Sequence, residues 1–149
     1  MGASVGIQEA IYALLRGDAT LIGLLAADLY EGSPSGPAVY DHVLQADESE
    51  DSANFPYVVI GDDTAAEFDT DDVDGEETTI VLHIWDRRRG RRRVKQIRDA
   101  IYNLVHGTQL DVSGQSTVLC YFEFSESIPD HDPLTQHGVI RFRIVTQES

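Results

Sequence analysis

Apolar residues recur with a helical period in three stretches of the chain. The first runs from Ser4 to Gly17, and the second is the segment TLIGLLAA, for which Asp18 is the expected N-cap. The third and longest runs from Gly90 to Gly107, where glycine ends the helix. The residues that we expect to face inward on the first and third helices are Ile7, Ala10, Ile11, Leu14 and Leu15, and Val94, Ile97, Ile101, Leu104 and Val105.

Other stretches alternate with the period of two that is typical of strands. In residues 77–86, Ile80, Leu82 and Ile84 share one face, while Val81, His83 and Trp85 share the other. The expected strands are 56–62, 77–86, 117–124 and 139–146, with a shorter candidate at 39–44. This order of elements predicts an α+β fold with a mostly antiparallel sheet of four to five strands and helices packed on one face.

Length and composition predict a globular protein with one domain spanning residues 1–149. The 149 residues are 42% hydrophobic and 25% charged, which are ordinary values for such a domain. No apolar run reaches the 18 residues that cross a bilayer, and the N-terminus lacks the features of a secretory signal, so we expect no membrane association and a cytosolic protein. Cys120 lies in an apolar strand row and is expected to be a buried thiol.

The charge is distributed unevenly. The formal net charge is -15, yet residues 87–98 hold eight of the eleven basic side chains and no acidic one, whereas residues 1–86 alone carry -18. Such a balance disfavours general nucleic-acid binding. Interspersed charges would keep the protein equally soluble, so the separation of basic from acidic residues indicates that the basic cluster binds a dedicated partner. The alternative interpretation is that the cluster is a solvated face of a helix.

Two charged clusters are therefore the candidate interface of this protein. The fourteen residues 63–76 hold seven carboxylates and are expected to project as a hairpin arm. Guanidinium groups bind carboxylates bidentately, so the arginines can pair with the arm of the same chain or, better, with that of a neighbour. Complementary patches at different places give head-to-tail contacts, which can close into rings. The interface candidates are Arg87, Arg88, Arg89, Arg91, Arg92 and Arg93, and Asp63, Glu67, Asp69, Asp71, Asp72, Asp74 and Glu76.

No catalytic constellation is recognisable. The sequence lacks phosphate-binding loops, nucleophile elbows and paired-cysteine or HExxH metal motifs. His131, Asp132 and His137 could ligate a metal if their loop folded back, but their spacing matches no zinc pattern and the flanking prolines are typical of an ordinary loop. His83 is more simply a satisfied core or interface histidine. We therefore expect no enzyme, no cofactor and no metal site.

The order of several short patterns resembles a known family. The patterns follow one another over residues 5–146 in this order: ALL near the end of the first helix, DATLIGLL, FPYVVIGD, an acidic insertion, TIVLHIWDR, a basic helix ending in LVHG, and HGVIRFRI. In this order they resemble the tail terminator proteins of long-tailed bacteriophages, also called tail completion or head-to-tail joining proteins. The dense arginine run before the third helix departs from that pattern.

The resemblance implies a structural virion protein without catalytic residues. Such proteins form hexameric rings that stop polymerisation of the tail tube and provide the surface on which the neck docks. The implied partners are further copies of the chain, the tail tube protein and a neck or head-completion protein, with DNA passing through the lumen without specific binding. The implied location is the head-proximal end of the virion tail, after assembly in the host cytoplasm. The alternative is an acidic DNA mimic that inhibits a host DNA-binding enzyme, which the arginine cluster disfavours.

Overall fold

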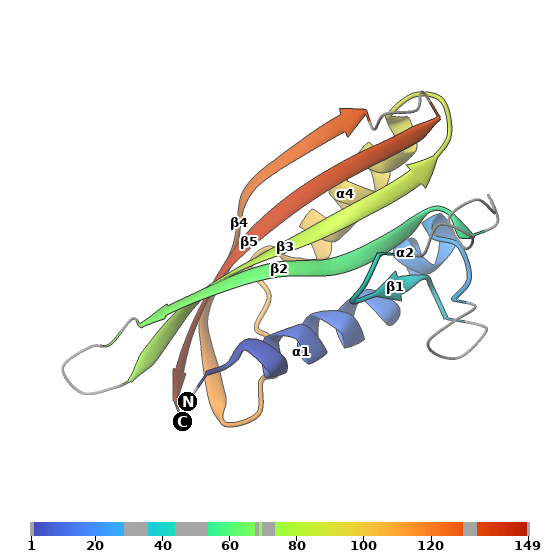
Figure 1. The fold of residues 1–149 in the computed structure, drawn as a ribbon. Coiled ribbons are helices and arrows are strands. Elements are labelled where there is room, and N and C mark those ends of the chain that lie inside the picture. Colours follow the sequence, from blue (N-terminus) through green and yellow to red (C-terminus); the bar gives the residue numbers. More distant parts are fainter. Residues whose placement is uncertain are drawn as a thin grey trace.

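The computed structural model describes residues 2–28, 36–43, 54–67, 69, 74–129 and 134–148 of the chain. Within these residues, three helices combine with a five-stranded sheet, which confirms the predicted α+β class (Figure 1). The elements in chain order are α1 (Ser4–Arg16), α2 (Ala19–Leu24), β1 (Val39–Tyr40), β2 (Tyr57–Glu67), β3 (Gly75–Arg87), α4 (Arg92–Val105), β4 (Gln115–Pro129) and β5 (Thr135–Glu148).

The helices begin and end close to where local chemistry predicts. Gly17 follows α1, and the Asp18 carboxylate accepts a 3.0 Å hydrogen bond from the Leu21 amide, as an N-cap does. The second helix ends at Leu24, three residues before the end of the segment in which we expected it. Gly107, just beyond α4, has φ of +75°, a conformation that glycine adopts without the strain of a side chain.

The sheet is mixed, which differs from the expectation from sequence. Its strand order is β1-β2-β3-β5-β4, and β1 pairs in parallel with β2 through Val39 and Tyr40, whereas the other three pairs are antiparallel. The expected strand at 39–44 is only these two residues long within the described part. A parallel pair between strands so close in sequence needs a connection that leaves the sheet and returns, which periodicity does not reveal.

The four long strands extend beyond their predicted bounds. The hairpin of β2 and β3 continues through polar residues to Glu67 and Gly75, so half of the fourteen residues of the expected acidic arm lie in the sheet. In Figure 1 this hairpin projects past the helices, and both termini lie near its base. We define the arm as residues 63–76. Phe68 and residues 70–73, at its end, lie outside the described residues.

The main core lies between the sheet and the two longer helices. Ile80, Leu82 and Ile84 of β3 are buried against the apolar faces of α1 and α4, as their alternation predicts. A Cβ at Gly138 would lie 2.6 Å from Val94 Cγ1, so α4 packs directly on the backbone of β5. Among the described residues, no helix is long and apolar enough to cross a membrane.

Candidate interaction surfaces

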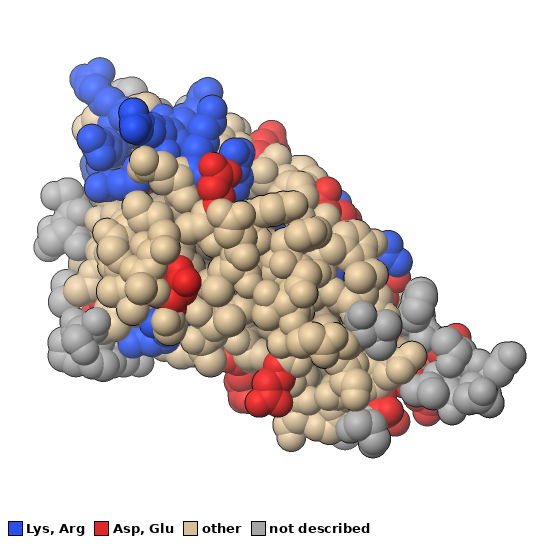
Figure 2. Space-filling model, turned by 180° about the vertical axis from the view of Figure 1, so that it is seen from behind, with Lys and Arg blue, Asp and Glu red and all other residues tan. Residues whose placement is uncertain are grey.

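The arginines form one end of the molecule. They occupy the end of β3, the turn at Gly90 and the start of α4, and Figure 2 shows Lys and Arg side chains gathered there. We call residues Arg87–Arg93 the arginine pole. Arg88, Arg89, Arg91 and Arg92 are exposed. Beside them Gly90, Arg91, Arg92 and Lys95 line an open groove of about 900 Å³, with Gln136 of β5 at its wall. This groove is large enough for side chains of a partner.

Arg93 differs from the other arginines because it is held within the chain. The buried carboxylate of Asp86 accepts hydrogen bonds from Arg93 Nε at 2.9 Å and Nη2 at 2.5 Å, and also from the Arg87 amide at 2.8 Å. The hydrogen bond to Asp86 raises the pKa of Arg93 above its ordinary value. Asp86 thus ties the last strand residue to the first turn of α4 and fixes the geometry of the turn. Sequence reasoning overlooked it, although an aspartate directly before an arginine run is a visible signal.

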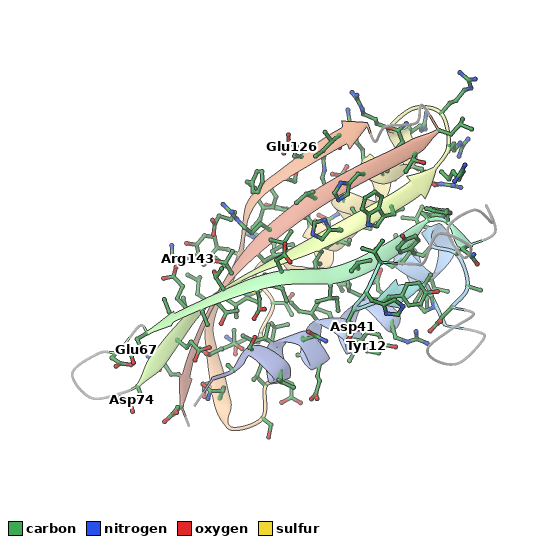
Figure 3. All side chains as sticks on the ribbon, viewed as in Figure 1. Tyr12, Asp41, Glu67, Asp74, Glu126 and Arg143 are labelled. Atoms are coloured by element: carbon green, nitrogen blue, oxygen red, sulfur yellow. The ribbon has the colours of Figure 1, made fainter. Side chains whose placement is uncertain are left out.

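The acidic arm lies at the opposite end. Figure 3 labels Glu67 and Asp74 near the end of the hairpin, where Glu67, Asp69, Asp74, Glu76 and Glu148 surround a hollow of about 210 Å³. Asp69 accepts a 3.0 Å hydrogen bond from the Gly75 amide. Asp71 and Asp72, which we also predicted in the interface, lie outside the described residues.

Two carboxylates of the arm, Asp63 at its base and Glu76 opposite Glu67, bind the start of α1. Asp63 accepts a hydrogen bond from the Ser4 hydroxyl, and Glu76 Oε1 accepts one from the Ala3 amide at 3.3 Å. Negative charge at a helix N-terminus is favourable because the helix dipole is positive there. These two residues therefore stabilise the fold of their own chain, and we call the other three carboxylates of the described arm, Glu67, Asp69 and Asp74, the distal carboxylates.

The arginine pole and the arm cannot meet within one chain. Both lie on the same strand, β3, which runs from Gly75 to Arg87, and twelve residue steps at about 3.3 Å each separate its ends by about 40 Å. Of the two partners considered from the sequence, the arm of the same chain is therefore excluded. The arm of a neighbouring copy remains open as a partner.

The suggested metal ligands do not gather in the described structure. His131 and Asp132 lie outside the described residues, and no group of three His, Cys, Asp or Glu residues able to hold a metal ion occurs within them. His137 instead stacks on Trp85, with ring centroids 4.0 Å apart. Cys120 is a buried thiol, as predicted, and burial raises its pKa to about 11.

His83 and His137 form a pair on the sheet face opposite the main core. Their nitrogens Nδ1 and Nε2 lie 2.8 Å apart, so one ring donates and the other must accept as a neutral imidazole. Burial lowers the pKa of His83, and the nearby negative charge of Asp62 partly opposes this. His83 is thus a satisfied, half-buried histidine, the simpler of the interpretations from sequence.

Lowering the pH should therefore destabilise the protein through His83. Because the pKa of His83 is lower in the folded than in the unfolded chain, its stabilising effect is complete above about pH 6.5 and is lost as pH falls through the folded value. Thermal unfolding at pH 7.5 and 5.5 measures this effect. We expect a smaller loss of melting temperature between these pH values in His83→Gln than in the unaltered protein; equal losses would exclude His83 as a cause.

Comparison with known proteins adds three findings. The model of the family "Tail completion protein gp17" matches residues 9–147. The chain is 30% identical over 89 residues to tail completion protein gp17 of Bacillus phage SPP1. That match covers 60% of this chain and 66% of the relative, so it spans slightly less than two thirds of the relative's length. A chain from the virion of a native gene transfer agent particle is similar in fold, with a TM-score of 0.79 at 21% identity and 98% of both chains covered.

Proposed function

The chain belongs to the family of tail completion protein gp17, as its sequence pattern implied, and we propose that it is a structural protein of the phage virion that forms a ring at the head-proximal end of the tail. The ring, of six subunits, caps the tail tube, stops its polymerisation and joins it to the neck or head-completion protein. The subunit is a single domain of residues 1–149 that assembles in the host cytoplasm. It acts without a cofactor and is not an enzyme.

The observation that carries this proposal is the separation of charge into two opposite poles. Each pole attracts the opposite pole of another copy, either twice across a two-fold axis in an antiparallel pair or once per contact in a head-to-tail series. The same two surfaces are complementary when copies associate head to tail. A heterologous contact of this kind builds a closed ring when the rotation that relates neighbouring copies is a full turn divided by a whole number.

At the subunit contact, at least two exposed arginines of the arginine pole bind carboxylates of an adjacent subunit or of a neck or tube protein. The four exposed guanidinium groups, those of Arg88, Arg89, Arg91 and Arg92, lie near a helix N-terminus and repel one another and the dipole, so an anionic partner would stabilise them. The distal carboxylates of a neighbouring arm supply that partner. Few of these arginines contact DNA.

The lumen of the ring is net negative and is supplied by the acidic segments. A wall that makes no phosphate-neutralising contacts releases no counterions on contact with DNA, so DNA slides through it without binding. The overall charge of -15 is compatible with such a wall. That charge also suits an acidic DNA mimic, but the exposed arginines at one pole would repel the basic groove that a mimic must enter.

Ring formation is tested by sedimentation of the purified protein at several concentrations, together with negative-stain imaging. We expect a single larger species to grow with concentration and to appear as rings, because head-to-tail contacts close cooperatively. A stable symmetric dimer that does not grow further would contradict the proposal, since its isologous interface leaves no free surface for the next copy.

A further inference from the structure

The open groove beside the arginine pole follows one side of α4, and we call it the α4 groove. Arg91, Arg92, Lys95 and Asp99 line it from the helix and its start, and Gln136 of β5 lines its wall. Positions 92, 95 and 99 are spaced by three and four residues, so their side chains share one face of the helix. The groove therefore leads away from the pole along the helix.

The charge of the α4 groove changes sign along its length. Arg91 and Arg92 lie at the start of the helix, Lys95 lies about one turn further on, and Asp99 about one turn beyond Lys95. At 1.5 Å per residue, the rise from Arg92 to Asp99 is about 10 Å. An anionic group is therefore attracted at the pole end of the groove and repelled at its far end.

The three cations of the α4 groove form no ion pair in the described part of the chain. Other basic side chains do form ion pairs, with nitrogen–oxygen distances of 2.5–3.4 Å: those of Arg16, Arg93, Arg98, Arg141 and Arg143. Repulsion among the groove cations is thus not offset by a described carboxylate close to them. An anionic occupant of the groove would stabilise them.

The end of the arm offers the same number of charges with the opposite sign. The distal carboxylates Glu67, Asp69 and Asp74 surround the hollow near the end of the hairpin, where Figure 3 labels Glu67 and Asp74. They form no ion pair with a described residue of their own chain. Because the hairpin projects past the helices in Figure 1, its end has a shape that can enter a groove.

We propose that the end of the arm of one copy docks in the α4 groove of the next copy, and that Lys95 and Asp99 determine how far it enters. This inference rests on the proposed head-to-tail association. The distal carboxylates bind Arg91, Arg92 and Lys95 through charge-assisted hydrogen bonds. Asp99 repels the same carboxylates, so the arm reaches Lys95 and advances no further.

Neutralising these two residues should change the association of subunits in opposite directions. Lys95→Gln removes an attraction at the contact and should weaken association about fivefold. Asp99→Asn removes a repulsion and should strengthen association about twofold. Both side chains are exposed, so each variant should unfold at the same temperature as the unaltered protein.

Sedimentation equilibrium of the full-length protein measures the association constant, and Asn103 supplies matched controls. Asn103 is exposed on the same helix, four residues beyond Asp99, and does not line the groove. Asn103→Asp changes the net charge as Lys95→Gln does, and Asn103→Lys changes it as Asp99→Asn does. Because the controls lie outside the groove, they should leave the association constant nearly unchanged.

We expect opposite shifts at positions 95 and 99, each larger than that of its control and each reduced at a salt concentration of about 0.5 M. Shifts equal to those of the controls would show that only the net charge matters, and would overturn docking in the groove while leaving head-to-tail association intact. Weaker association of Asp99→Asn would also overturn it. An unaltered protein that does not associate at any concentration would overturn this docking and the proposed ring together.

Discussion

Reversing two charges of the arginine pole should abolish the joining of tails while leaving the subunit folded. Arg91 and Arg92 are exposed, line the basic groove and make no contribution to the buried core. Arg91→Glu with Arg92→Glu replaces attraction by repulsion at the proposed contact. Disrupting a close interfacial charge pair costs about 2–5 kcal/mol, so association should weaken by about thirtyfold or more.

The measurement counts joined particles in an assembly reaction and follows ring formation by sedimentation. Arg91→Lys with Arg92→Lys is the control that keeps the charge and loses the bidentate fork, and it should retain part of the activity. The decisive second variant adds Glu67→Arg and Asp74→Arg to the charge-reversed chain. Because positions 91 and 92 and positions 67 and 74 then carry opposite charges again, with the signs exchanged, head-to-tail assembly should return in part. Normal joining by the first variant, with its fold intact, would mean that these arginines are only a solvated face.

Removing the buried carboxylate beside the pole should give the largest loss of stability. Asp86→Ala leaves Arg93 and the Arg87 amide without their acceptor in a buried site. Removing one partner of a buried ion pair lowers the free energy of unfolding, here by about 2–3 kcal/mol. This value is at the lower end of the range because the Arg93 side chain is partly exposed and can be rehydrated. For a chain of this length, that corresponds to a fall in melting temperature of about 5–10 °C.

Thermal unfolding of three variants checks this expectation. Asp99→Ala removes an exposed carboxylate whose contact with Arg98 is 3.4 Å long, and it should change the stability by less than about 0.5 kcal/mol. Asp86→Asn keeps an acceptor oxygen and should fall between the two. Equal effects of Asp86→Ala and Asp99→Ala would show that Asp86 does not anchor α4.

The elements that local chemistry determines could be predicted from the sequence. The apolar spacing of α1 and α4, the Asp18 cap and the alternation of Ile80, Leu82 and Ile84 all appear as expected. Strand ends were less predictable, because the pairing of β2 with β3 carries both strands through polar residues such as Asp63 and Glu67 that have low strand propensity.

Contacts between residues that are distant in the sequence could be identified only from the folded structure. The bond between Arg93 and Asp86 removes one arginine from the candidate interface, and the pairing of His83 with His137 joins strands whose order periodicity does not give. The separation of the two poles follows only once β3 is known to connect them directly. The charge clusters were thus visible in the sequence, whereas their opposite placement was not.

A structure of the assembled ring is the most direct test of head-to-tail association, because it shows which surfaces of neighbouring copies are in contact. We expect the arginine pole of each subunit to face the acidic arm of the next and the lumen to be net negative. An assembly in which the arginines line the lumen, or in which two arms or two arginine poles meet across a two-fold axis, would contradict it.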